Sequence, residues 1–383
     1  MTPAQRREVA FYDYRHDFLF EEEDLVRIFR ETGRRGAFIL QPELACFEGN
    51  LAVFTDARHA LGVANATDAL HLALRAAGAG AGDEVIFCSH TMTATAAAIH
   101  FAGATPVPVE CGADHLIDPA AVAEAITART RAVLPTQLNG RTANMDALTE
   151  IASRHGLVIV EDAAQALGSR FRGQAAGTFG AAGAISFYPA KILGCLGDGG
   201  AILTNDGGVY ESLLRLRDHG RSADGEIVSW GFNSRLDNLQ AAFLDWRLQR
   251  LSKVFGRRRE LARLYRERLE GLEELTLPPG PDDDPEHLDV FQNYEIEAKR
   301  RDALRQFLKA SGIGTLIPWG GKAVHQWEGL GFRARLPYIE SLFERLLLLP
   351  LNPSLTDDDV HIVCDAIVNF YRNPDSHRNE MYT

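Results

Sequence analysis

A lysine between two short apolar segments is the first candidate for chemistry in this chain. Lys191 ends the run Ser186–Lys191, and the glycine-rich stretch Gly194–Gly200 follows it. Residues 184–187 and 201–204 are mostly apolar and predict two strands, which would withdraw the ammonium group from water. Because desolvation favours the neutral amine, it lowers the pKa of a lysine and prepares it to attack a carbonyl. Lys191 is therefore a candidate Schiff-base lysine, and a solvated loop lysine is the alternative.

A carboxylate at the end of an apolar strand is the second candidate. Asp162 stands just beyond the apolar run 157–160, where a charge is costly unless a cation or a hydrogen-bond donor meets it. A protonated pyridine nitrogen would meet that need. Gln165, three residues further on, lies on the same side if the segment is helical. The alternative is that Asp162 only caps the next helix.

A third pattern predicts an anion site at the start of a helix. The short strand 59–64 runs into residues 65–68, and a helix rich in alanine and leucine follows to Ala77. A strand, a tight turn and a helix present free backbone N–H groups, which suit a phosphate. The alternative is that Thr67 or Asp68 caps the helix without any ligand.

The elements around these residues predict a doubly wound α/β domain, because strands alternate with helices. The clearest strands are residues 84–88, 105–109, 131–135 and 157–160, and the clearest helices are residues 119–128 and 145–155. Another helix is predicted to open at Ser89–Thr91 and to continue through Ile99. Two prolines make 105–109 a candidate edge strand. In such a sheet, ligands bind beyond the carboxyl ends of the strands, which is where Asp162 stands.

The domain organisation follows from the same pass along the chain. We expect an N-terminal arm at 1–30, a large domain at 31–247, a small α+β domain at 248–374 and a mobile tail at 375–383. The arm is predicted to carry one amphipathic helix, Glu21–Thr32.

The connection between the two domains is predicted to be a long charged helix. It covers residues 236–271, with a break near Gly256. Because arginines 257–259 have glutamates nearby, we expect them to form a solvated face. Residues 278–285 are rich in Asp, Pro and Gly and predict a loop.

The composition is that of a globular protein of 383 residues, long enough for two domains. A net charge of -12 argues against nucleic acid or an anionic membrane as the main partner. The five cysteines form no CxxC pair, so we expect reduced thiols and no metal. Residues 1–15 lack an apolar signal core and Leu346–Leu349 is too short to span a bilayer, so we expect a soluble cytoplasmic protein.

Five motifs, taken together and in this order, resemble the sugar-nucleotide aminotransferases of the DegT type. These are pyridoxal phosphate (PLP) enzymes with fold type I, the fold of the aspartate aminotransferases. The motifs are residues 65–70, 161–165, 186–191, 197–200 and 231–237. The resemblance extends from about Gln41 to Phe370. It implies a large doubly wound domain with a mainly parallel mixed sheet and a small C-terminal α+β domain.

The resemblance implies roles for the residues singled out above. Lys191 would form the Schiff base with PLP. Asp162 would pair with the pyridine nitrogen and keep the ring an electron sink, and Gln165 would approach the ring oxygen.

The resemblance also implies a phosphate site and a homodimer. Ala66, Thr67 and Ser186 would hold the phosphate, and Asn233 would reach the phosphate of the neighbouring subunit. Ala66 departs from the family, which usually has glycine there, but a backbone N–H remains. Met92 stands where the family often has an aromatic residue stacked on the pyridine ring, and its thioether would pack there instead.

The implied activity is transfer of an amino group from an amino acid, with L-glutamate expected, to a nucleotide-linked keto-deoxyhexose through the pyridoxamine phosphate (PMP) form. Residues 317–325 look more like family members that aminate C4 of a TDP-4-keto-6-deoxyhexose. The expected substrate contacts are Tyr188, Trp319, Lys322 and His325. A core aromatic is the alternative for Tyr188, and a buried structural histidine is the alternative for His325.

Other activities stay open on the same fold. A C3 keto-sugar or a keto-cyclitol could be the acceptor. A sugar 3-dehydratase is disfavoured because Lys191 is present and no cysteine cluster is found. A non-catalytic regulator is disfavoured because the lysine, the strand-end aspartate and their neighbours are all intact.

Overall fold

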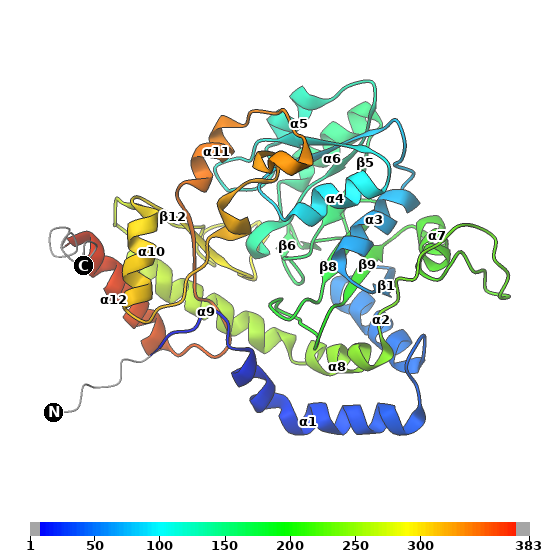
Figure 1. The fold of residues 1–383 in the computed structure, drawn as a ribbon, viewed down its shortest axis with the longest axis horizontal. Coiled ribbons are helices and arrows are strands. Elements are labelled where there is room, and N and C mark those ends of the chain that lie inside the picture. Colours follow the sequence, from blue (N-terminus) through cyan, green and yellow to red (C-terminus); the bar gives the residue numbers. More distant parts are fainter. Residues whose placement is uncertain (1–7, 373–383) are drawn as a thin grey trace.

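The computed structural model describes residues 8–372, so the tail predicted at 375–383 and residues 1–7 of the predicted arm lie outside the described residues. The centre of the fold is a mixed seven-stranded sheet (Figure 1). In spatial order its strands are β1 (His59–Val63), β9 (Gly200–Thr204), β8 (Ala182–Ser186), β5 (Val158–Asp162), β4 (Thr130–Leu134), β2 (Glu84–Cys88) and β3 (Thr105–Val109).

Within this sheet β9 runs antiparallel to its neighbours β1 and β8, and the strands from β8 to β3 are parallel to one another. Strand β3 is outermost. This confirms the edge predicted from its prolines, which cannot donate to a partner.

Helices cover both faces of the sheet. They are α2 (Pro42–Thr55), α3 (Ala66–Ala76), α4 (Thr93–Phe101), α5 (Pro119–Ala125), α6 (Met145–His155), α7 (Gly207–Arg217) and α8 (Asn238–Leu248). Val85 of β2 lies in the core formed with α3, α4 and α7, whereas the next residue, Ile86, lies in the core formed with α5 and α6. Because both faces are buried, the strands need no polar alternation, as the doubly wound prediction requires.

A second, three-stranded sheet organises the C-terminal part of the chain. It contains β10 (Leu275–Thr276), β12 (Tyr294–Ala298) and β13 (Leu346–Leu349), and it packs with α9 (Leu251–Leu269), α10 (Arg301–Ala310) and α12 (Asp357–Arg372). Tyr265 of α9 stacks on Tyr294 of β12, with ring centroids 4.8 Å apart. A third small sheet joins β6 (Arg170–Phe171), β7 (Gln174–Ala175) and β11 (His287–Leu288).

The segment between α10 and β13 is mostly irregular. It contains the short 3-10 turns η2 (Pro318–Gly321), η3 (Val324–Gln326) and η4 (Glu328–Leu330), followed by α11 (Pro337–Phe343). Three residues of α11, Ile339, Leu342 and Phe343, lie in the same core as Ile86 of the large sheet. This segment therefore ties the C-terminal part to the large sheet. Within residues 8–372, no helix is both long enough and apolar enough to cross a membrane.

The predicted long connector is two helices. Its break lies at Gln249 and Arg250, between α8 and α9, and Gly256 lies inside α9. The solvated face predicted for arginines 257–259 is wrong for Arg258, whose exposed fraction is 4%. Helix α9 crosses from the large sheet to the small one (Figure 1). The side of the helix that carries Arg258 is therefore buried, which the pattern of charges along the helix does not reveal.

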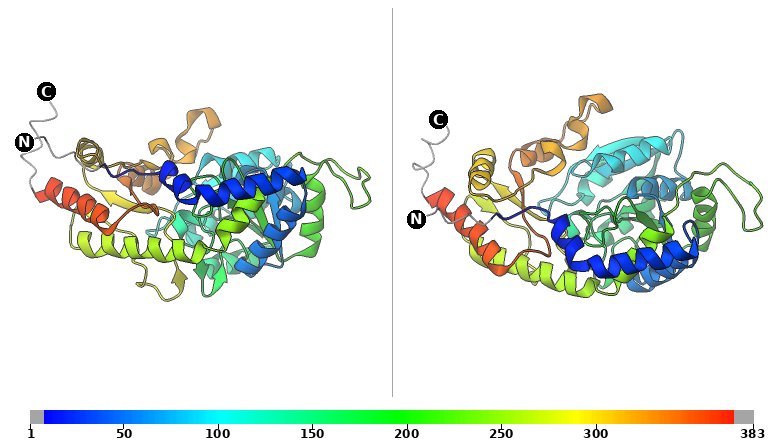
Figure 2. Two further views of the ribbon diagram at one scale, coloured as in Figure 1. Left: turned by 90° about the horizontal axis from the view of Figure 1, so that it is seen from below. Right: turned by 60° about the horizontal axis from the view of Figure 1, so that its bottom comes forward.

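Two helix boundaries also differ from the predictions. Helix α1 (Tyr14–Arg35) is longer than expected, begins at an Asp13 cap and lies along α8 (Figure 2). Helix α4 begins at Thr93 rather than near Ser89. The four residues before it are not helical, so their side chains can extend from the end of β2 toward the carboxyl edge of the sheet.

Candidate active site

Most of the predicted site residues line one cavity of about 470 Å³ at the carboxyl edge of the large sheet. These residues are Ala66, Thr67, Met92, Asp162, Gln165, Ser186, Tyr188, Lys191 and Trp319. They come from the ends of several parallel strands and from the loops that follow, as expected for a ligand site of a doubly wound sheet.

Lys191 lies half-buried in the loop between β8 and β9. Burial lowers the pKa of its ammonium group to about 8, and the nearby Asp162 carboxylate only partly counters this shift. The loop is clamped by Gln292, whose Nε2 donates to the Ala190 carbonyl and whose Oε1 accepts from the Ile192 N–H, both at 2.9 Å. The sequence does not single out Gln292, because the residues around it give no sign that its side chain contacts the loop of Lys191 in the large domain.

Asp162 is buried at the end of β5, with an exposed fraction of 4%. Burial raises the pKa of its carboxyl above the usual value, and a hydrogen bond from Thr95 and the Lys191 charge partly oppose this. The Thr95 hydroxyl donates to Oδ2 at 2.7 Å. Behind it, Thr91 lies 2.9 Å from Thr95, and Thr136 donates to Thr91 at 3.0 Å. This row of hydroxyls is a second feature that sequence reasoning missed.

The predicted anion site lies at the start of α3, whose cap differs from the alternative considered above. The cap is Asn65, whose side chain accepts the Asp68 N–H at 2.8 Å, so neither Thr67 nor Asp68 fills this role. The N–H groups of Ala66 and Thr67, in the first turn, have no partner within the helix. Gly200 lets β9 approach the start of α3, because a Cβ at position 200 would lie 2.6 Å from the Asn65 carbonyl carbon.

Gln165 is oriented by a turn that the C-terminal part holds in place. Its Oε1 accepts the Asn139 N–H at 2.8 Å, and the Asn139 side chain accepts from Asn293 at 2.8 Å. Next to this turn, Arg141 pairs with Asp284 at 2.8 Å and with Asp289 at 2.5 Å.

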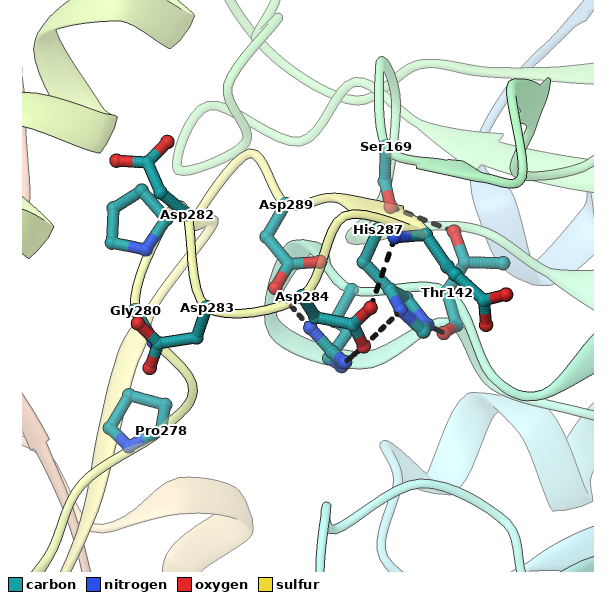
Figure 3. Close-up of polar contacts among 12 residues, drawn as sticks. Thr142, Ser169, Pro278, Gly280, Asp282, Asp283, Asp284, His287 and Asp289 are labelled. Carbon is teal, nitrogen blue, oxygen red and sulfur yellow. Dashed lines mark hydrogen bonds and ion pairs between the residues drawn. The ribbon is translucent and has the colours of Figure 1, made fainter.

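His287 also fixes the loop that carries Asp284. As Figure 3 shows, its ring lies between Asp284, at 2.7 Å, and the Thr142 carbonyl, at 3.1 Å. The predicted loop 278–285 is therefore docked on the large domain, and its contacts hold the segment that positions Gln165.

Three predicted site residues do not line the cavity. Asn233 is exposed on the segment after α7. The Lys322 ammonium lies 5.1 Å from the centre of the Trp327 ring. His325 is buried, with Nδ1 2.7 Å from the Ser89 hydroxyl and Nε2 3.4 Å from Glu340, which is the structural arrangement left open above.

Two residues that do line the cavity have individual features. The Met92 sulfur caps α4 by accepting the Ala94 N–H at 3.2 Å. Trp319 has a positive φ of 53°, and its indole N–H is buried with no partner among residues 8–372. Such a donor costs free energy unless a bound group accepts from it.

A buried ion-pair network joins the two sheets. Glu295 of β12 contacts His115 Nδ1 at 2.9 Å and His90 Nε2 at 3.5 Å. Burial alone would lower the pKa of both histidines, but the Glu295 carboxylate overrides it and raises that of His90 to about 9 and that of His115 to about 10. Among the described residues, these three bring their donor atoms within 4.8 Å of one another.

This geometry fits pyridoxal phosphate. Lys191 offers an amine of lowered pKa, Asp162 offers a buried carboxylate for a protonated ring nitrogen, and the α3 N-terminus with Ser186 offers donors for a phosphate. The fold and the cavity thus define a PLP-dependent enzyme of fold type I.

Comparison with known proteins identifies the family within this class of enzymes. Residues 20–368 match the DegT/DnrJ/EryC1/StrS aminotransferase family. The chain is 46% identical to the dTDP-3-amino-3,4,6-trideoxy-alpha-D-glucose transaminase of Streptomyces venezuelae, over 87% of this chain and 88% of the relative.

Solved structures agree. The structure of S. venezuelae DesV in complex with a ketimine intermediate superposes with a TM-score of 0.91 at 42% identity, covering 95% of this chain and 98% of DesV. NtdA of Bacillus subtilis with bound cofactor PMP has a TM-score of 0.88 at 27% identity, covering 97% of this chain and 87% of NtdA. The chain therefore belongs to the DegT/DnrJ/EryC1/StrS aminotransferase family, and it is a sugar-nucleotide aminotransferase whose cofactor is PLP.

Proposed function

We propose that this enzyme moves an amino group from L-glutamate to the C3 ketone of a TDP-linked keto-deoxyhexose. The observation that carries the chemistry is the pairing, in one cavity, of a lysine whose pKa is about 8 with a buried carboxylate. When bound, PLP supplies the electron sink that makes Cα–H bonds of the donor acidic. The remaining roles fall to side chains of this chain.

Lys191 is the residue we assign to the Schiff base and to proton transfer. With PLP bound, the Lys191 amine would move a proton between Cα of the donor and C4′ of the cofactor, and in the second half-reaction between C4′ and the sugar carbon that receives the amino group. A pKa of about 8 suits both directions near neutral pH. Gln292 holds the residues on both sides of the lysine, so the amine keeps its position when it is free.

The other cavity residues orient the cofactor. Asp162, with its Thr95 hydrogen bond, would keep a positive charge on the ring nitrogen, and Gln165 would face the ring oxygen. Ala66, Thr67 and Ser186 would hold the phosphate at the positive end of α3. Met92 would pack against the ring.

The position of amination was predicted as C4 from residues 317–325. Within that segment Trp319 lines the cavity, whereas Lys322 and His325 do not. A relative with 46% identity is named for a 3-amino sugar, which favours C3 for this chain. We therefore propose C3 and keep C4 as the second candidate, with Tyr188 and Trp319 as the sugar contacts.

A second copy of the chain completes the site in this proposal. The segment between α7 and α8 projects from the body (Figures 1 and 2) and carries Ile227, Val228 and Trp230, whose exposed fraction is 94%. Such apolar side chains need a cover in water. On the same segment Asn233 is exposed, as a residue that contacts a neighbouring phosphate must be.

The experiment that tests the proposal follows the visible absorbance of the cofactor. The protein is converted to its PMP form, and keto-sugar nucleotides are added one at a time. Recovery of the PLP spectrum with a TDP-3-keto sugar supports C3, and recovery only with a 4-keto sugar returns the assignment to C4. Lys191→Ala should keep the fold and lose turnover, and an active Lys191→Ala variant would remove the role assigned to the lysine.

A further inference from the structure

Three side chains with metal-binding donor atoms meet at the junction of the two sheets. His90 follows β2, His115 lies in the loop after β3, and Glu295 belongs to β12. Along the chain the two histidines are 25 positions apart, and His115 and Glu295 are 180 positions apart. The expectation of no metal rested on the spacing of the cysteines, which cannot reveal a set of donors that only the fold brings together.

The nitrogens that face Glu295 are His115 Nδ1 and His90 Nε2. The first lies 2.9 Å from Glu295 Oε1, and the second lies 3.5 Å from Glu295 Oε2. All three residues bring their donor atoms within 4.8 Å of one another. Two ligand atoms bonded to one tetrahedral zinc ion at about 2.0–2.1 Å are about 3.4 Å apart. Small movements of these side chains would therefore place all three around one ion.

The other ring nitrogen of each histidine has an acceptor of its own. His90 Nδ1 lies 3.3 Å from the His115 carbonyl oxygen, and His115 Nε2 lies 3.4 Å from Glu297 Oε1. Arg345 in turn holds Glu297 at 2.9 Å. Histidines that bind metal commonly donate from the other ring nitrogen to a carbonyl or a carboxylate, and this leaves the ligand nitrogen without a proton.

His90 Nε2 is a buried atom that lacks a hydrogen bond. His90 is 1% exposed, and its Nε2 has no hydrogen-bond partner among residues 8–372. The 3.5 Å separation from Glu295 is beyond the usual range for a hydrogen bond. Such a buried polar atom costs free energy unless something binds it. A cation between the imidazole and the carboxylate would satisfy both groups.

The surroundings provide access and a fourth ligand. A cavity of about 70 Å³ has His115 and Glu295 in its wall, and it has room for water, which can complete the coordination of an ion held by three side chains. The Cys111 thiol acts on both histidines, so it is a second candidate for the fourth position. Two imidazoles and a carboxylate suit zinc and its neighbours, whereas calcium and magnesium prefer oxygen ligands.

We propose that His90, His115 and Glu295 bind one divalent transition-metal ion, with zinc as the test ion, and that this ion ties β12 to the loops after β2 and β3. Zinc would take the place of two imidazole protons, which pass to the solvent, so the net charge of the buried cluster would not change. Because Thr91 and Met92 follow His90 and line the candidate active site, the ion would also steady that wall. The alternative is that the three residues form only the ion-pair network described above.

The test uses the PLP-loaded enzyme, cleared of metal with a chelator that is then removed. Zinc content is measured by elemental analysis and zinc affinity by calorimetry. The wild type should take up one zinc ion per chain, and zinc should raise its unfolding temperature. His115→Gln and Glu295→Gln should each bind zinc roughly 100-fold more weakly, because one of three protein ligands is lost.

The matched control is His325→Gln. His325 is also buried and lies 3.4 Å from a glutamate, Glu340, but it belongs to no group of three such donors within residues 8–372. This variant should bind zinc as the wild type does.

Three results would overturn the proposal. If the metal-free wild type takes up no zinc, the three residues form an ion-pair network only. If His115→Gln and Glu295→Gln bind zinc as tightly as the wild type, the ion lies elsewhere, and the same holds if His325→Gln alone loses it. Should a variant fail to fold, anomalous scattering from a zinc-soaked wild-type crystal decides. A peak bonded to His90, His115 and Glu295 supports the proposal, and a peak elsewhere, or none, refutes it.

Discussion

Replacing Thr95 by valine tests how Asp162 is kept ionised at the end of β5. Valine has nearly the same shape as threonine but cannot donate the 2.7 Å hydrogen bond to Asp162 Oδ2. Hydrogen bonds to charged groups contribute about 1.5–3 kcal/mol. Since one pKa unit corresponds to about 1.36 kcal/mol, the Asp162 pKa should rise by roughly 1–2 units above its already raised value.

The sign of the effect on stability follows from linkage. A carboxyl whose pKa is higher in the folded state loses stability as the pH rises from the unfolded pKa to the folded one. Thr95→Val should therefore destabilise the PLP-free protein by about 1.5–3 kcal/mol near pH 7.5. Below about pH 4 the difference should largely vanish, because Asp162 is then protonated in both the wild type and the variant.

Urea unfolding at several pH values measures this difference, and absorbance titration of the PLP-loaded enzyme measures whether the ring nitrogen loses its proton at lower pH. Thr105→Val is the matched control, because Thr105 is exposed at the start of the edge strand β3. If Thr95→Val and Thr105→Val behaved alike in both assays, Thr95 would not be what holds the charge on Asp162.

Two further predictions concern contacts between the sheets. Gln292→Leu removes both side-chain hydrogen bonds to the lysine loop and should lower kcat roughly 10- to 100-fold while changing PLP affinity little. The control is Gln240→Leu, which removes two similar hydrogen bonds to Leu196 in the same loop and should leave kcat unchanged. Equal losses of kcat in the two variants would contradict the positioning role of Gln292. Glu295→Gln should cost about 3–5 kcal/mol in unfolding free energy at pH 7, because it leaves buried histidine charge unpaired. The pKa values of His90 and His115 are raised to about 9 and 10, so their contribution to stability is complete below about pH 6.5 and is lost as the pH rises through 9 and 10. If the difference in unfolding free energy between the wild type and Glu295→Gln does not shrink by pH 10, this reasoning is refuted.

What the sequence predicted well is the part of the cavity wall built from single strand ends. Asp162 and Ser186 each follow an apolar run, and a parallel sheet brings such ends to one edge. The predicted strand, turn and helix at residues 59–77 are also found, whereas the cap is Asn65 rather than Thr67 or Asp68, and the anion site itself stays a prediction. The sequence places several side chains that could cap this helix within four positions, and only the backbone geometry selects Asn65.

What the sequence could not predict depends on contacts between distant segments. Thr95 is an ordinary helix residue until the fold turns it toward Asp162. Arg258 lies in a run of charged residues, and charge patterning along one helix cannot show that three carbonyls from other segments meet it. In both cases the local pattern is compatible with a surface position, and packing overrides it.

The strained segment at the junction of the two sheets explains why these distant contacts belong together. Phe291 adopts a positive φ of 52°, which is unfavourable for a bulky side chain. Arg258 bonds its carbonyl and the next one, and this conformation directs the Gln292 side chain onto the lysine loop. One residue further on, Asn293 bonds the turn that orients Gln165. The strain is thus maintained by a buried cation, and the same short segment sets the positions of Lys191 and Gln165, the two residues to which we assign roles at the cofactor.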